Sequence, residues 1–212
     1  MRALVLTGAG DRAFVAGADI TEMSEMTPLQ ALRFAEAGHR LGELLEAMEK
    51  PVIAAINGYA LGGGCEVAMA CDFALASEKA TIGQPEVNLG IIPGFGGTQR
   101  MLRRVPIGMA RELVYSGRSL SAEEALRVGL VNAIYPADEL LPKAKELGKL
   151  IAGKGPLAVA RCKRLMTAGL GLPLGAANEL ERQTFAALFA SADQKEGMRA
   201  FLEKRSPSFQ GR

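Results

Sequence analysis

The chain has 212 residues, of which 49% are apolar and 23% are charged, and its formal net charge is +2. This composition is typical of a globular chain with one substantial core. Charges of both signs are mixed along it, and no basic patch with interleaved aromatics indicates a nucleic-acid-binding surface. No apolar run is long enough to span a membrane, and no signal or transit peptide precedes the first strand, so we expect a cytoplasmic protein.

Cysteine and histidine usage limits the chemistry further. The three cysteines, Cys65, Cys71 and Cys162, are odd in number, which predicts reduced thiols rather than a disulfide framework or a metal site. His39 is the only histidine, so a Ser-His-Asp or Cys-His mechanism would have to use it. It lies in a predicted helix with no nucleophile motif nearby, which disfavours that mechanism.

In chain order, the first element is a buried strand over residues 3–7, which starts with no lead-in. Residues 8–13, GAGDRA, then match the G-x-G-x-x-A fingerprint of dinucleotide-binding folds. That fingerprint requires a helix to begin at once, whereas residues 13–19 contain another glycine and show no helical period. We therefore expect a loop with exposed amides over residues 16–19 in place of a nucleotide site.

A long helix is predicted next, followed by a buried strand. Thr27 is a suitable N-cap because Pro28 and Gln30 follow at the first and third helical positions. The helix should run to about Lys50, where Pro51 stops it, and residues 52–56, VIAAI, then form the strand. One buried face is expected on this helix, formed by Leu41, Leu44, Leu45 and Met48.

Residues 57–72, NGYALGGGCEVAMACD, carry the strongest functional signal. Three consecutive glycines let the backbone approach a ligand, and amides at the start of a helix favour a developing negative charge. Glu66 follows in an apolar segment, where burial of a lone carboxylate is costly unless it is paired or its pKa rises. Exposed amides beside such an acid indicate an oxyanion hole next to a general acid or base. The alternative is a tight glycine turn and a glutamate that reaches solvent.

The order strand, turn, helix places Gly63 and Glu66 at the carboxyl end of a strand, where open α/β sheets bind ligands. Short strands are also predicted at residues 73–76 and 81–82. The segment 83–98 is rich in glycine and proline and should be irregular, and a long loop this apolar is often functional.

This loop contains Glu86, for which a solvated loop acid is the alternative. Its glycine cluster at residues 94–97 lacks the Gly-Lys-Ser/Thr of a P-loop, so a nucleotide site is disfavoured. Phe95 and Met101 are candidates for shaping an apolar pocket, with ordinary core packing as the alternative.

The rest of the chain is mostly helical from Pro106. Ser121 and Glu124 form a capping box, and Gly129 ends that short helix. Residues 131–134 should form the last strand.

Asp138 should cap the next helix. Helices are predicted near residues 138–153, 156–169, 174–191 and 193–204. This layout divides the chain into an α/β core over residues 1–135 and a helical region over residues 136–212. We expect the helical region to pack against a neighbouring subunit.

Four segments, in this order and spacing, resemble the enoyl-CoA hydratase (crotonase) family: AFVAGADI, PVIAAINGYALGGGCEVAMACD, IGQPEVNLGIIPGFGGTQR and SAEEALRVGLV. The match covers essentially the whole chain. The resemblance implies an α/β fold, a spiral of ββα units with C-terminal oligomerisation helices. Such chains build trimers, often stacked as hexamers. Family members carry an N-terminal strand pair and helix before the strand that begins here at Ala3, so we expect a chain that lacks this segment and binds CoA more weakly.

The resemblance also implies roles for single residues. The backbone N–H groups of Ala18 and Gly63 would form the oxyanion hole, and Glu66 and Glu86 would be the catalytic carboxylates. The substrate-binding residues that it implies are Ala16, Ala18, Asp19, Ile20, Thr21, Gly62, Gly63, Gly94, Phe201 and Lys204.

Three of these positions carry a further expectation. Thr21 stands where family members commonly have Lys, so a contact with the phosphate or ribose of CoA is expected to be lost. Phe201 and Lys204 match positions that reach the CoA of a neighbouring subunit.

The implied reaction adds water to a short-chain trans-2-enoyl-CoA and yields the 3-hydroxyacyl-CoA, as in fatty acid β-oxidation. It needs a base for the water, a proton for Cα and stabilisation of an enolate-like oxygen. Two carboxylates of opposite protonation state and two amides would meet these needs. No metal or redox cofactor is expected, since coenzyme A is part of the substrate.

The expected partners are therefore an acyl-CoA thioester and further copies of the chain, as a homotrimer or a hexamer, with neither nucleic acid nor membrane. Two alternatives stay open. One is another crotonase-type acyl-CoA reaction, such as an isomerase or lyase reaction. The other is a truncated, catalytically impaired form that binds CoA esters. Both glutamates are present, whereas isomerases and dehalogenases of the superfamily lack or replace this pair, which favours the hydratase.

Overall fold

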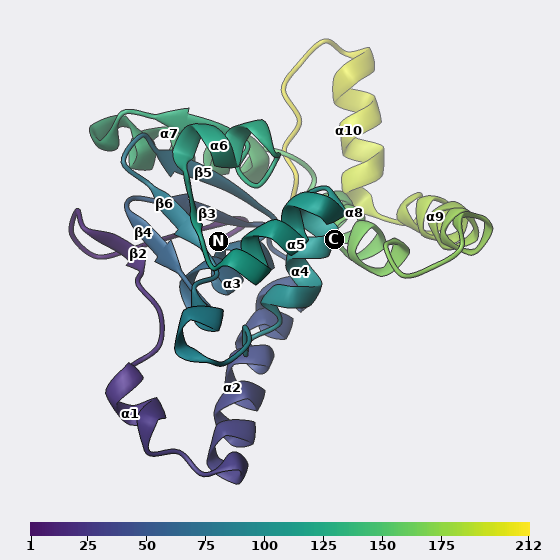
Figure 1. The fold of residues 1–212 in the computed structure, drawn as a ribbon. Coiled ribbons are helices and arrows are strands. Elements are labelled where there is room, and N and C mark those ends of the chain that lie inside the picture. The colour runs from purple at the N-terminus through teal and green to yellow at the C-terminus, as the bar shows by residue number, and fades with distance from the viewer. The chain divides into compact units, whose positions relative to one another are not determined.

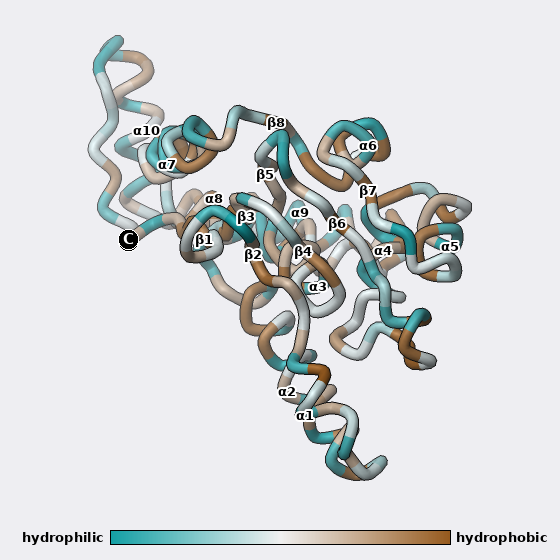
Figure 2. The backbone as a smooth tube through the Cα atoms, turned by 60° about the vertical axis from the view of Figure 1, so that its left-hand side comes forward, coloured by the Kyte–Doolittle hydropathy of each residue, from teal (hydrophilic) through white to brown (hydrophobic).

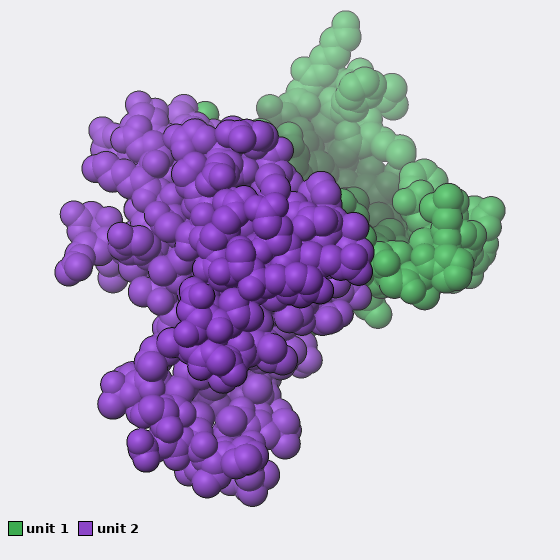
Figure 3. Space-filling model, in the orientation of Figure 1, with its two compact units in different colours: residues 1–4, 47–51, 146–212 green, residues 5–46, 52–145 purple.

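The computed structural model describes residues 1–212. The chain forms two compact units (Figure 3): the larger contains residues 5–46 and 52–145, and the smaller contains residues 1–4, 47–51 and 146–212. The division into residues 1–135 and 136–212 stays a prediction.

Eight short strands form two four-stranded sheets (Figure 1). The first sheet has the order β1-β3-β5-β8, with β1 at Leu4–Thr7, β3 at Val52–Ile56, β5 at Phe73–Ser77 and β8 at Ala133–Tyr135. The second has the order β2-β4-β6-β7, with β2 at Ala13–Val15, β4 at Tyr59–Leu61, β6 at Thr81–Gly83 and β7 at Ser119–Ser121.

From β1 to β6 the strands alternate between the two sheets, so each repeat contributes its first strand to one sheet and its second strand to the other. Strands from successive repeats are parallel, as in β2 with β4, β4 with β6, and β3 with β5. Strand β7 is antiparallel to β6. A helical segment follows each strand pair: α1 (Ile20–Ser24) with α2 (Pro28–Ala47), then α3 (Gly63–Ala70), then the 3₁₀ helix η1 (Glu86–Leu89) with α4 (Gly97–Arg104). This is the expected spiral of ββα units.

The core of the larger unit is built around β3 and α3. Strand β3 is buried along its whole length, as its continuous apolar run predicts for a strand with a neighbour on each side. Helix α3 contacts β2, β4, β5 and α4. Strand β1 is only half-buried, contrary to the expected burial, because it lies at the edge of its sheet and has one neighbour.

The helices after α4 are α5 (Ile107–Ser116), α6 (Ala122–Arg127), α7 (Ala137–Ala152), α8 (Pro156–Gly169), α9 (Leu174–Leu188) and α10 (Ala192–Leu202). Ser121 and Glu124 form the predicted capping box of α6. In the smaller unit α8 contacts α9, and the chain end returns to α10, where Asp193 accepts the N–H groups of Gln210 and Gly211. None of these helices combines the length and the apolar character that a membrane crossing requires.

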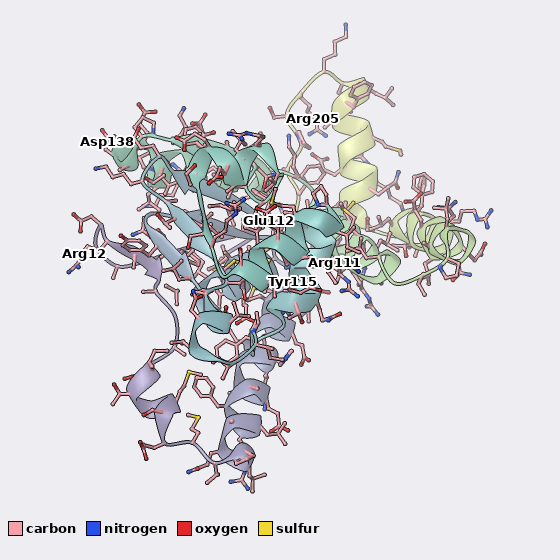
Figure 4. All side chains as sticks on the ribbon, viewed as in Figure 1. Arg12, Arg111, Glu112, Tyr115, Asp138 and Arg205 are labelled. Atoms are coloured by element: carbon pink, nitrogen blue, oxygen red, sulfur yellow. The ribbon has the colours of Figure 1, made fainter.

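Two local predictions are wrong. Asp138 does not precede α7 but lies in its first turn (Figure 4), where the N–H groups of Glu139 and Leu140 donate to the carbonyl of Pro136. In α2, Leu41 and Leu44 are exposed, and the buried residues are Gly42 and Leu45. Figure 2 shows both hydrophobic and hydrophilic residues along α2. The side chains of Phe95 and Arg100 approach α2 at Gly38 and Gly42, and not at Leu41 and Leu44.

Sequence patterns also missed α1, α4, β4 and β7. Each is short or rich in glycine, so hydrophobic periodicity gives little signal there. The loop expected at residues 16–19 is confirmed.

The glycine face of α2 makes a stability prediction. Alanine in place of a helix-interior glycine usually stabilises a protein by roughly 0.5–1 kcal/mol. A Cβ at Gly38, however, would overlap the ring of Phe95, whereas a Cβ at Gly108 in α5 would meet no atom within 4 Å. We expect urea unfolding to show Gly108→Ala as neutral or stabilised and Gly38→Ala as destabilised. Equal stabilisation of both variants would contradict the packing of Phe95 on α2.

Candidate active site

A cavity of about 560 Å³ lies in the larger unit, and it brings three distant stretches of sequence together. Its walls come from the loop after β2 with α1, from α2, from the β4–α3 turn, and from the segment between β6 and α4. Most lining residues are apolar, and the carboxyl groups in the wall are those of Glu66 and Glu86.

Most of the predicted site residues line this cavity: Ala16, Ala18, Ile20, Gly62, Gly63, Glu66, Glu86 and Gly94. Asp19 and Thr21 do not line it. Instead, the Asp19 carboxylate accepts the N–H groups of Thr21 and Glu22 and caps α1.

Phe201 and Lys204 lie in the smaller unit, at the end of α10 and just after it, and Phe201 is 83% exposed. Phe95 lines the cavity and contacts the ring of Phe34, with ring centroids 5.2 Å apart. Met101 is buried and belongs to the core, which is the alternative left open for it.

The β4–α3 turn brings backbone amides to the cavity wall. Gly62 has a φ of 54°, and a Cβ there would lie 3.1 Å from an oxygen of Glu86, so glycine is required both by conformation and by space. A Cβ at Gly64 would overlap the carbonyl oxygen of Val15. This close approach places the first turn of α3, whose N–H groups have no intrahelical acceptor, beside the loop that contains Ala18.

Glu66 lies in the first turn of α3 and is only 2% exposed. Its Oε1 accepts the N–H of Phe95 at 2.8 Å and the N–H of Gly97 at 2.6 Å. Burial raises the pKa of Glu66, while the hydrogen bonds from Gly97 and Phe95, followed by the charges of Arg100 and His39, oppose that rise. The residue is therefore a buried carboxylate with fixed donors.

Glu86 opens η1 and is 8% exposed, so it is not the solvated loop acid of the alternative interpretation. Its Oε2 is buried and has no hydrogen-bond partner. Burial raises the pKa of Glu86 to about 7; its own backbone N–H opposes this rise, and the charge of Glu66 adds to it.

The two carboxyl groups therefore differ in protonation although they are the same residue type. Glu66 has two N–H donors that stabilise its charge, whereas Glu86 has an unpartnered oxygen and faces the negative charge of Glu66. Below a pH of about 7, Glu86 holds a proton while Glu66 is the group better suited to ionise. A pair whose environments separate the two pKa values in this way can supply an acid and a base to one reaction.

The groups near the two glutamates form neither a metal site nor a reactive thiolate. No three His, Cys, Asp or Glu side chains lie together as a metal site would require. All three cysteines are free, and burial raises the pKa of the Cys65 thiol to about 12.

Sequence reasoning missed several residues around the cavity. Phe34 and Met23 line it from α2 and α1, and Arg100 approaches Glu66 from outside the wall. The sequence around an apolar helix residue does not distinguish a cavity-lining position from a core position. For Arg100, the only sequence feature that could have indicated a role is the glycine cluster that precedes it.

Comparisons with known proteins agree with this geometry. Residues 1–212 match the enoyl-CoA hydratase/isomerase family. The crotonyl-CoA hydratase of Syntrophomonas wolfei is 51% identical over 206 residues, which cover 97% of this chain and 79% of that protein. The short-chain-enoyl-CoA hydratase of Clostridium acetobutylicum is 49% identical over 203 residues, covering 96% and 78%. The crystal structure of an enoyl-CoA hydratase from Bacillus anthracis has a TM-score of 0.97 at 43% identity, covering 100% of this chain and 82% of that one.

The raised pKa of Glu86 predicts how stability depends on pH. Between the ordinary pKa of 4.5 and the folded value of about 7, the folded chain binds a proton that the unfolded chain has lost, so this group reduces stability as pH rises. The full reduction is up to about 3 kcal/mol, at about 1.4 kcal/mol per pKa unit. We expect Glu86→Gln to unfold at higher urea concentration than the unmodified chain at pH 8. At pH 4.5 the two should be similar, and a difference that does not change with pH would contradict the prediction.

Proposed function

This chain belongs to the enoyl-CoA hydratase/isomerase family, and we propose that it is a hydro-lyase that adds water to a short-chain trans-2-enoyl-CoA to give the 3-hydroxyacyl-CoA. One observation carries this proposal: two buried glutamates with unlike hydrogen bonding line one apolar cavity beside the first turn of α3. Relatives at about 50% identity, named crotonyl-CoA hydratase and short-chain-enoyl-CoA hydratase, support the same substrate class.

Glu66 is the base in this proposal. Its Oε1 is occupied by the N–H groups of Phe95 and Gly97, which stabilise the ionised form and fix its orientation. The second oxygen is left for the water, from which it accepts a proton as the oxygen of the water bonds to Cβ of the enoyl group.

Glu86 is the acid. Its raised pKa keeps it protonated up to about neutral pH, its Oε2 has no hydrogen-bond partner, and the residue lines the cavity. It donates its proton to Cα as the π bond between Cα and Cβ is lost, and the Cα–Cβ single bond remains. The hydration adds one hydrogen to Cα and one hydroxyl to Cβ, and passage of a proton from Glu66 back to Glu86 restores the starting state.

The N–H groups of Ala18 and Gly63 receive the thioester oxygen. Negative charge develops on this oxygen as the water adds, and removal of one such donor typically costs about 10²–10³ in rate. The first turn of α3 adds to the effect, since helix N-termini favour negative charge. Both proton transfers and the charge stabilisation come from the chain itself, so we propose that no metal or redox cofactor takes part.

The acyl chain binds against the apolar wall. Phe34 of α2 and Phe95 contact each other there, and Met23 and Ile20 contribute from α1. We place the reaction in cytoplasmic fatty acid β-oxidation, whose 2-enoyl intermediates belong to this substrate class.

We also propose a homotrimer, or a hexamer made of two trimers. In the smaller unit, large apolar side chains of α9 and α10 are exposed, among them Phe185, Phe201 and Leu202 at 62%, 83% and 80%. Further copies of the chain would cover this surface, since patches of this kind are rare on monomers. Phe201 and Lys204 would then contribute to a neighbouring subunit's CoA site.

Replacement of either Glu66 or Glu86 should cause a large loss of hydratase activity. Loss of the conjugated enoyl-thioester absorbance of crotonyl-CoA measures hydration directly. We expect Glu66→Gln and Glu86→Gln each to lower kcat by about 10²–10⁴-fold, the usual contribution of a positioned acid or base. The control Glu43→Gln, at an exposed position of α2, should retain full activity. An unmodified chain that binds crotonyl-CoA without turnover would contradict the proposal, and conversion of a 3-enoyl-CoA alone would favour an isomerase.

The proposed assembly can be tested by its molecular mass in solution. Sedimentation equilibrium at micromolar concentration should give a trimer or a hexamer. Phe201→Asp should shift the distribution toward monomer, because a charge would enter an apolar interface. A monomeric unmodified chain would contradict the assembly while leaving the chemistry of the larger unit untouched.

A further inference from the structure

The N–H groups that hold Glu66 belong to a glycine-rich loop, and this loop is itself held by Arg100 of α4. The Nη1 atom of Arg100 donates to the carbonyl oxygen of Phe95 at 2.6 Å. Phe95 is also one of the two residues whose N–H groups donate to Glu66. The backbone of Phe95 is thus fixed on one side by the carboxylate and on the other by the guanidinium.

Helix α2 determines where the guanidinium lies. The Nε atom of Arg100 forms an ion pair with Oε1 of Glu46 at 2.7 Å. A Cβ at Gly42 would lie 2.5 Å from Nη2, and a Cβ at Gly96 would overlap Nη1, so the guanidinium rests on bare backbone at both places. The Arg100 side chain is only 13% exposed.

A simpler interpretation is that Arg100 only joins α4 to α2. A flexible lysine could form such a link. The observed geometry instead uses the planar fork of arginine, with Nε on a carboxylate of one element and Nη1 on a carbonyl of another. The cation also lies close enough to Glu66 to favour its ionised form.

We propose that Arg100 is a positioning residue for the base Glu66: it holds the Phe95 carbonyl so that the Phe95 and Gly97 N–H groups point at the carboxylate, and it places a fixed positive charge behind that carboxylate. This inference rests on the proposed function, in which Glu66 accepts a proton from water.

Other charged groups face the same region and must be considered. His39 and Glu46 come from α2, Arg104 from α4 and Glu86 from η1. His39 also favours ionised Glu66, but less than Arg100 does, and Glu46 is occupied by Arg100 itself. The two protein charges that act in favour of ionised Glu66 are therefore those of Arg100 and His39.

The pH dependence of kcat for crotonyl-CoA hydration tests the inference. Activity on the acidic side is lost as Glu66 gains a proton. Removal of the cation in Arg100→Gln should raise the pKa of Glu66, so the acidic limb should move to higher pH by about one unit, the low end of the effect of a nearby opposite charge. We expect kcat at its pH optimum to fall about 10-fold through loss of the aimed N–H groups, with KM within about threefold.

Two further variants separate charge from geometry. Arg100→Lys retains the positive charge without the fork, so its acidic limb should stay in place while kcat falls. Glu46→Gln retains an acceptor for Nε, so it should keep most of the activity. Arg103→Gln is the matched control, because Arg103 is exposed on the same helix and donates to the backbone carbonyl of Gln99.

An unshifted acidic limb in folded Arg100→Gln would overturn the inference. If that variant does not fold, Arg100→Lys decides: full kcat there would show that the fork is not needed. Inactivity of the unmodified chain would instead contradict the proposed function. Titration of Glu66 by carboxyl ¹³C NMR, in the unmodified chain and in Arg100→Gln, still tests the inference in that case, and equal Glu66 titrations in these two proteins would overturn it.

Discussion

The structure of the larger unit depends on the burial of two carboxyl groups in one apolar cavity. Glu66 and Glu86 are 2% and 8% exposed, and an isolated charge in such a place is costly unless it is paired or neutralised. The chain meets this constraint differently at the two positions. Glu66 receives two backbone donors and lies near the guanidinium of Arg100, whereas Glu86 has no partner for Oε2 and burial raises its pKa to about 7.

The order of the strands explains how distant residues reach this cavity. Strands β2, β4 and β6 are neighbours and run parallel, so their carboxyl ends lie at the same edge of the sheet. Residues 16–18 follow β2, residues 62–66 follow β4 and residues 84–86 follow β6. The loop with Ala18, the turn with Gly63 and Glu66, and Glu86 are therefore placed together by three repeats of one topological unit, in agreement with the general location of ligands in α/β sheets.

Local patterns predicted the parts of this site that depend on local causes. The glycine run and the apolar flanks of Glu66 indicated a buried acid beside exposed amides, and the buried strand β3 and the capping box of α6 followed from the same kind of reasoning. The burial of Glu86 could not be predicted in this way, because its cover comes from the β4–α3 turn and not from its own neighbours in sequence. The exposed leucines of α2 had the opposite outcome: their spacing is helical, but Phe95 and Arg100 approach α2 at Gly38 and Gly42, and Leu41 and Leu44 stay exposed. Other residue roles came from the family resemblance and were assigned by position in the sequence. The fold adds that most of these residues, such as Ala18, Gly63 and Glu86, line one cavity.

A difference in environment, rather than in residue type, therefore separates the acid from the base. The donors to Glu66 are the main-chain N–H groups of Phe95 and Gly97. Any residue except proline has such a group, so the residue types at these positions do not predict where the N–H groups point. The direction of these N–H groups is set by the contacts that hold the loop. These are the hydrogen bond from Arg100 to the Phe95 carbonyl, the ion pair of Arg100 with Glu46, and the close approach of Arg100 to Gly42 and Gly96. Each of these contacts joins the loop to α2 or α4, and neither Arg100 nor Glu46 lines the cavity. In the role proposed for Arg100, the packing between α4 and α2 therefore acts on the pKa of Glu66 through the loop, and not through contact with the substrate.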